Sequence, residues 1–218
     1  ANHVMLGRAH ASVTPATEQS LAAAASAFEN AVTTAPTGRE RARILVDVAG
    51  IYLRLADANS ANASAHTSLA ADKLRAAVAE DSTFALAHTR LGEVLFNQGV
   101  KPSEAQQQTL LADAHAHFER ANALTDPRDT LHGLGDQSGD DEVRATALYY
   151  LSRLAVEWPG HLNERRAITL ADAALELEAA WPHRRQACLA RIRFARVQAN
   201  DGSSGYCVLT GQPAPNAE

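Results

Sequence analysis

Apolar residues recur along the chain at the three- and four-residue spacing that is typical of amphipathic helices. In the segment 39–58, one such face carries Leu45, Val48, Ile51, Tyr52 and Leu55. Proline, glycine and asparagine stand between these segments, where they end helices or favour turns. The pattern predicts an all-α chain of about nine helices: a short one within 2–12, then 14–34, 39–58, 66–80, 84–98, 109–124, 142–157, 163–180 and 184–199.

A short motif of alanine around a larger apolar residue, Ala-x3-Phe or Leu-x2-Ala, recurs along the chain. It occurs at 24–31, 70–77 and 114–121. Before each copy stands an apolar residue followed by a small one, as Leu6-Gly7, Val48-Ala49 and Leu91-Gly92. Such recurrence at a period of about 45 residues indicates a repeat protein whose unit is a pair of helices.

The segment from His88 to Pro127 resembles one tetratricopeptide (TPR) repeat. That family has the pattern aromatic-x2-Leu-Gly-x2-Tyr, then Ala-x3-Phe, then Pro. Here His88 stands in place of the aromatic residue and Leu95 in place of the tyrosine. The resemblance covers residues 1–127 well and 142–199 weakly, and each unit is about ten residues longer than the 34 of the family. It implies a right-handed TPR-like superhelix of antiparallel helix pairs.

The repeats predicted on this basis span roughly 1–36, 37–82, 83–127 and a degenerate 128–182, followed by a terminal helix, 183–200, and an extended tail, 201–218. We expect a loop at 128–141, where glycine and aspartate oppose a helix. Small residues of the motif let helix backbones approach closely, and larger ones fill the space between them. The residues expected to pack the repeats are Gly7, Ala24, Phe28, Tyr52, Leu91, Gly92, Ala114 and Phe118.

Charge and hydropathy argue against two classes of partner. The formal net charge is −5 and no basic stripe occurs, so we expect no nucleic-acid binding. No run of 18 apolar residues occurs, so we expect no membrane span.

Three features favour an exported protein. Cys188 and Cys207 flank a Gly/Ser-rich turn, and a disulfide between them would stabilise by about 3 kcal/mol and indicate an oxidising compartment. The alternative is two unrelated thiols, one of them buried. Asn62-Ala-Ser64 matches a glycosylation sequon, which also arises by chance. The chain begins at Ala1 rather than methionine, as processing would explain, and we expect an extracellular or periplasmic location.

Candidate catalytic and metal-binding residues are weak. His115 and His117 are two residues apart on a predicted helix, so they point to different faces. The acidic segment 136–142 lacks the spacing of a calcium loop. No Gly-x-Ser-x-Gly nucleophile motif and no Gly-rich phosphate loop occur. We therefore expect no catalytic residue, metal or cofactor. An enzyme with an unrecognised His/Asp site is the third class of function, after the two binding functions described next.

The expected function is a non-catalytic scaffold for protein–protein contacts, in which other copies of the chain are slightly favoured as partners. Both ends of the predicted solenoid expose apolar residues, and head-to-tail contacts of this kind form open filaments when they do not close into rings. The expected subunit contacts are Val4, Met5, Leu6, Tyr206, Val208 and Leu209. The alternative is a monomeric periplasmic or lipid-anchored adapter that holds a partner peptide in its concave groove.

Overall fold

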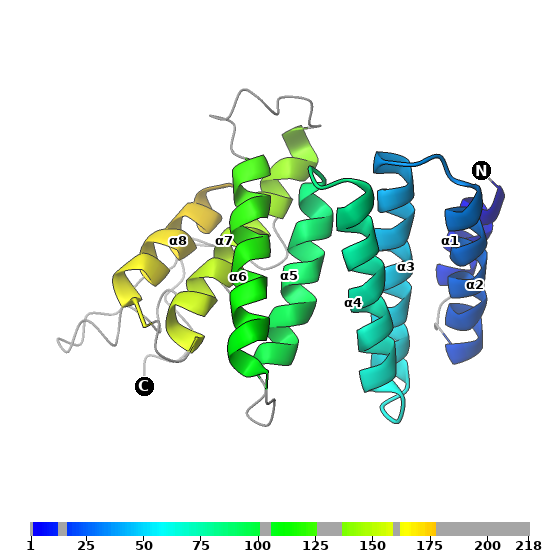
Figure 1. Cartoon of the computed structure of the whole chain (residues 1–218), viewed down its shortest axis with the longest axis horizontal. Coiled ribbons are helices and arrows are strands. Elements are labelled where there is room, and N and C mark those ends of the chain that lie inside the picture. Colours follow the sequence, from blue (N-terminus) through cyan, green and yellow to red (C-terminus); the bar gives the residue numbers. More distant parts are fainter. Residues whose placement is uncertain (1, 13–16, 101–105, 126–136, 159–161, 178–218) are drawn as a thin grey trace, which may run out of the picture. The chain divides into compact units, whose positions relative to one another are not determined.

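A computed structural model describes residues 2–12, 17–100, 106–125, 137–158 and 162–177 of the chain (Figure 1). Eight helices and no strand occur in these residues, which confirms the all-α class. The helices are α1 (Asn2–Ala11), α2 (Glu18–Thr34), α3 (Arg39–Ala58), α4 (Ala63–Glu80), α5 (Ala85–Gly99), α6 (Gln107–Leu124), α7 (Gln137–Glu157) and α8 (Glu164–Leu177). The predicted ninth helix, 184–199, and the tail lie outside the described residues.

The chain divides into two compact units, 1–94 and 95–218, and the boundary falls within α5. In the first unit each helix packs on the next, α1 on α2, α2 on α3 and α3 on α4. Side-chain contacts give their directions. Asn59 after α3 donates to Glu18 at the start of α2 (2.8 Å), and Arg41 near the start of α3 donates to the carbonyl of Ala35 after α2 (2.7 Å). The helices α2 and α3 are therefore antiparallel.

The start of α3 is likewise fixed to the end of α4. The backbone N–H of Gly38 donates to the Glu80 carboxylate (3.1 Å), which also pairs with Arg41 (3.2 Å), and Arg39 pairs with Asp81. Gly38 has a φ of +85°, a conformation that a residue with a Cβ atom rarely adopts. The two helices are thus antiparallel, and the turn before α3 depends on glycine.

The alanine motif of the sequence lies inside the first unit. Phe28 and Leu74, which occupy the same place in successive copies, are both buried. A Cβ atom added to Gly7 would lie only 2.7 Å from the Phe28 ring, so the backbone of α1 approaches that ring at contact distance. Glycine at this position therefore allows α1 to pack on α2.

In the second unit α7 packs on both α6 and α8. Trp158 after α7 donates to Gln108 at the start of α6 (2.7 Å), and Arg144 donates to Asn122 near the end of α6 (3.2 Å), so α6 and α7 are antiparallel. Every residue of 145–152 is buried. A helix that is covered on all sides needs apolar or small residues around its whole circumference, which explains the Ala, Leu and Tyr content of this segment.

Three predicted helix starts are wrong. The helix expected from Thr14 begins at Glu18, because Thr17 and Ser20 bind each other's backbone N–H groups in a capping box (3.1 and 3.0 Å). The helix expected from 66 begins at Ala63, since the N–H of His66 already bonds to the carbonyl of Asn62 (3.0 Å). The helix expected from 142 begins at Gln137, so part of the predicted loop at 128–141 is helical.

Candidate functional site

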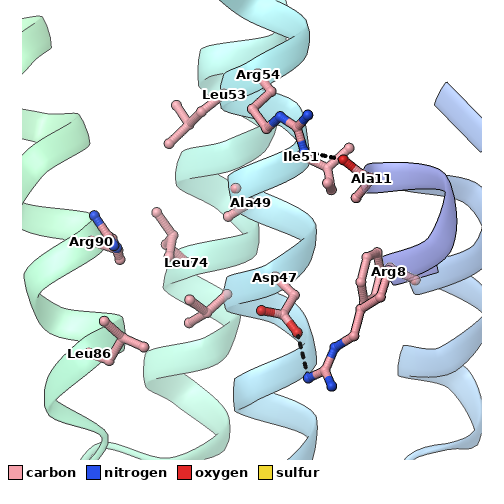
Figure 2. Close-up of a pocket in the computed structure, with 13 residues that line it drawn as sticks. Arg8, Ala11, Asp47, Ala49, Ile51, Leu53, Arg54, Leu74, Leu86 and Arg90 are labelled. Atoms are coloured by element: carbon pink, nitrogen blue, oxygen red, sulfur yellow. Dashed lines mark hydrogen bonds and ion pairs between the residues drawn. The ribbon is translucent and has the colours of Figure 1, made fainter. Parts of the chain in front are cut away.

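A pocket of about 440 Å³ opens on one side of the first unit. Most of its lining residues come from α1, α3 and α5, with one side chain each from α2 and α4 (Figure 2). A volume of this size suits a short peptide segment or a small molecule. Its apolar lining includes Phe28, Val46, Ile51, Leu53, Leu74 and Leu86.

The pocket carries three guanidinium groups and one carboxylate, from Arg8, Arg54, Arg90 and Asp47. Arg8 lies 3.8 Å from Asp47, and Arg54 donates to the carbonyl of Ala11 at the end of α1 (2.9 Å), as Figure 2 shows. Arg90 pairs with Glu93 (2.9 Å) on its own helix. Even with Glu93 counted, positive charge exceeds negative charge around the pocket.

The contacts from α1 to α3 also show the direction of these helices. Arg8 faces Asp47 and Ala11 faces Arg54, so sequence numbers rise together on the two helices. They run parallel, with α2 between them in the chain.

Gly50 lies on the pocket side of α3 and has no atom within 4 Å of the position that a Cβ would take. No positive φ requires glycine there. A glycine inside a helix makes the fold less stable than an alanine at the same position would, by about 0.5–1 kcal/mol. Neither packing nor backbone conformation accounts for this glycine, and its effect is to leave the exposed surface of α3 uncovered where it lines the pocket.

Asp47 is the pocket's own carboxylate. Burial raises its pKa, and the positive charges of Arg8 and Arg43 lower it without cancelling that effect. The folded protein therefore binds this proton more readily than the unfolded chain does. Its ionised form reduces stability above the folded pKa, and that loss disappears as the pH falls towards the ordinary value of 3.8.

We expect Asp47→Asn to unfold at a higher denaturant concentration than the wild type at pH 7, because the variant has no carboxylate to desolvate. The advantage should shrink as the pH is lowered towards 4. Urea titrations over this pH range measure it, with the exposed Asp57→Asn on the same helix as the control. A variant that is less stable than wild type at pH 7 would show that the pairing with Arg8 outweighs burial.

A polar cluster joins α2, α3 and α4 away from the pocket lining. The Glu29 carboxylate accepts from the Tyr52 hydroxyl (3.3 Å) and pairs with Lys73 (2.7 Å), and the Tyr52 ring stacks on His66 at 6.2 Å. Burial first, and then the negative charge of Glu29, raise the pKa of Tyr52. Each charged group has a partner within the cluster, so its evident role is to join three helices.

A second cluster lies in the second unit. The Arg153 guanidinium lies 4.5 Å from the centre of the Phe96 ring and binds Glu157 through two hydrogen bonds of 2.8 and 2.9 Å. Burial lowers the pKa of Arg153, but the bonds to Glu157 outweigh it and the pKa lies above its usual value. This arginine is held by aromatic rings and a carboxylate, which indicates a structural role.

The residues expected to pack the repeats lie on α1, α2, α3, α5 and α6. Tyr52 is partly exposed, and the others are buried: Gly7, Ala24, Phe28, Leu91, Gly92, Ala114 and Phe118. His88 and Leu95, which depart from the family pattern, are buried as well. Burial is what a packing role requires, and a Cβ atom on Gly7 would lie 2.7 Å from the Phe28 ring.

The expected subunit contacts fall into two groups. Met5 and Leu6 are exposed by 70% and 49%, and Val4 is partly buried against α2 and α3. Tyr206, Val208 and Leu209 lie outside the described residues.

The remaining predicted sites involve modification, disulfide bonding or metals. Asn62 is exposed immediately before α4, where a glycan would not meet the core. Cys188 and Cys207 lie outside the described residues. Within the residues that the structure describes, no group of three or more His, Cys, Asp or Glu side chains could hold a metal ion, and no helix there is long and apolar enough to cross a membrane.

The sequence interpretation missed the pocket residues, although a signal for them exists. Positions can be counted from the pairs Leu6-Gly7, Val48-Ala49 and Leu91-Gly92. Arg8 and Gly50 each follow directly after such a pair, and Asp47 and Arg90 each stand directly before one. Alignment of the repeats in this register places them on one face.

Comparison with known proteins adds no relative. A scan against models of protein families finds no match for this chain, and a search of curated proteins finds none either. Inferences about function therefore depend on the pocket's own residues.

Proposed function

We propose that this chain is a non-catalytic scaffold for protein–protein contacts that binds an extended peptide segment of a partner in the pocket of its first unit. The observation that carries the proposal is the pocket itself. It is lined mainly by apolar side chains, and charged groups at fixed places could orient a ligand. Pockets with an apolar lining and a few placed charges are typical binding sites.

The lining favours an elongated ligand over a compact one. Arg8 and Arg90 come from helices at opposite sides of α3, and Asp47, Gly50 and Arg54 lie along α3 itself (Figure 2). An extended peptide exposes alternate side chains on one side, which suits contacts placed one helical turn apart.

Selection of peptides from a displayed random library on the full-length chain tests this proposal. We expect enriched peptides that bind at one per chain in calorimetry and compete with one another. Leu53→Glu, which introduces a charge into the lining, should abolish their binding, whereas Leu69→Glu on α4, which is exposed and outside the lining, should not. Absence of enrichment, or equal binding of the peptides to both variants, would contradict peptide binding in this pocket.

Self-assembly is the second candidate, and the exposure of Leu6 on α1 supports it. Met5 on the same helix is also exposed and is the other α1 side chain available for such a contact. If copies associate through α1, light scattering should show a mass that rises with concentration, and Leu6→Glu should remove the rise. A constant monomer mass would leave only the peptide-binding role. Export stays a prediction.

A further inference from the structure

We propose that the pocket selects an acidic extended segment of a partner protein, in which a bulky apolar side chain next to a carboxylate rests on Gly50. This inference rests on the proposed function and names the chemistry of the ligand. Three observations support it, namely the charge balance, the loose Arg8 contact and the room above Gly50.

The charge balance of the pocket favours a ligand with negative charge. The pocket presents three arginines against Asp47, and Asp47 already lies under the influence of Arg8 and Arg43. A second carboxylate brought by the ligand would meet guanidinium groups, which bind carboxylates through paired, charge-assisted hydrogen bonds. A cationic segment would find one partly buried carboxylate that is already near two arginines.

The arginines are able to receive that carboxylate. The Arg8 side chain is 65% exposed and its contact with Asp47 is long, at 3.8 Å, so it can turn to a ligand at little cost. Arg54 uses one terminal nitrogen on the Ala11 carbonyl, and a guanidinium carries five N–H donors. The two groups come from adjacent parallel helices, so they can approach one carboxylate from two sides.

Gly50 determines how large a ligand side chain next to the carboxylate can be. Gly50 is exposed on α3, and nothing lies within 4 Å of the position its Cβ would take. The apolar side chains Leu53, Leu74 and Leu86, from α3, α4 and α5, line the same pocket. A leucine or similar side chain of the ligand would be buried there against apolar walls. The same geometry predicts that a larger residue in place of Gly50 fills the site without disturbing the helix.

The test uses three capped, fluorescein-labelled peptides and the full-length chain. The probes are Ser-Glu-Leu-Ser-Glu-Leu-Ser, its glutamine counterpart and its lysine counterpart. Fluorescence anisotropy should show the glutamate peptide binding at least about tenfold more tightly than either other probe, a ratio that corresponds to one paired charge. Raising the salt concentration should reduce that preference.

Variants then separate the two parts of the inference. Gly50→Leu should weaken the glutamate peptide by about tenfold or more while the melting temperature and helix content do not fall. Arg8→Gln and Arg54→Gln should each remove most of the preference over glutamine. The matched control is Arg75→Gln, an exposed arginine of α4 outside the lining, which should change nothing.

Each outcome decides one part. Equal binding of the three probes, with loss in Gly50→Leu, would overturn the acidic preference and leave the groove function intact. Unchanged binding in Gly50→Leu would overturn the role of Gly50. If library-selected peptides bind but the glutamate probe does not, the inference fails while the proposed function stands, and if neither binds, both fail.

Discussion

Replacing Phe118 with alanine is expected to lower the free energy of unfolding by about 3–5 kcal/mol. The Phe118 side chain is fully buried, and its ring stacks on Tyr150 with 5.0 Å between centroids and 3° between planes. Tyr150 in turn meets Phe96 edge-on at 5.3 Å. Removal of the Phe118 ring leaves a cavity beside Tyr150 that α6 and α7 cannot close without a shift of these contacts.

Denaturant titration followed by tryptophan fluorescence measures this effect. Both tryptophans, Trp158 and Trp181, belong to the second half of the chain, so their emission reports on the unit that contains Phe118. Phe118→Leu keeps much of the apolar volume and should cost less, about 1–2 kcal/mol. Ala123→Ser on the exposed side of α6 should stay within about 0.5 kcal/mol. A loss below about 1 kcal/mol in Phe118→Ala would contradict the packing described for this cluster.

The second large effect is the coupling between Gly7 and Phe28. Phe28→Ala alone should cost about 3–5 kcal/mol, because the ring is buried between α1, α2 and α3. Gly7→Ala alone should cost about 1–3 kcal/mol, because its Cβ would lie 2.7 Å from that ring. In the double variant the new methyl group has room, so the total loss should be smaller than the sum by about 1–3 kcal/mol.

Circular dichroism during urea unfolding gives the four free energies of this cycle. Additive losses would show that the two residues do not touch, and would remove the close packing of α1 on α2. Gly50→Ala provides the matched control for a glycine in a helix, since no atom would meet its methyl group. It should stabilise the fold by about 0.5–1 kcal/mol.

Where periodicity was strong, the sequence predicted the helices closely. The segment 39–58 is helical over the predicted range, and Asn163 caps α8 by accepting from the N–H of Arg166 (3.0 Å), as expected. The alanine motif also predicts buried positions, because small residues between larger ones only suit a close helix contact. Superhelix handedness does not follow from this local pattern and stays a prediction.

Two of the three misplaced helix starts, those of α4 and α7, have a common cause. The Asn, Asp and Ser residues around the start of α4, and the Ser, Gly and Asp residues in the first turns of α7, favour turns when they are judged alone. Both helices were therefore expected to begin later. Contacts formed only in the folded chain outweigh these preferences. In α7 the buried run 145–152 is anchored on both sides by α6 and α8, and the helix extends back to Gln137 despite Gly139.

The pocket was harder to predict than the helices. Its charged residues are scattered along the chain and form no motif, and only the pairing of α1 with α3 brings Arg8 beside Asp47 and Arg54 beside Ala11. The more conspicuous candidates in the sequence were the histidines and the acidic segment 136–142. These contacts between α1 and α3 form only in the folded chain, so the local pattern of either helix alone does not predict them.

The central claim is that the first unit binds an extended peptide along α3, and amide chemical shifts of the isotope-labelled full-length chain test it most directly. On titration with a library-selected peptide, or with the glutamate probe, we expect saturable shifts concentrated at Arg8, Asp47, Gly50, Arg54 and Arg90, with little change at Arg75 on α4. Shifts confined to Leu6 and its neighbours on α1, or no saturable shift in the first unit, would contradict the account.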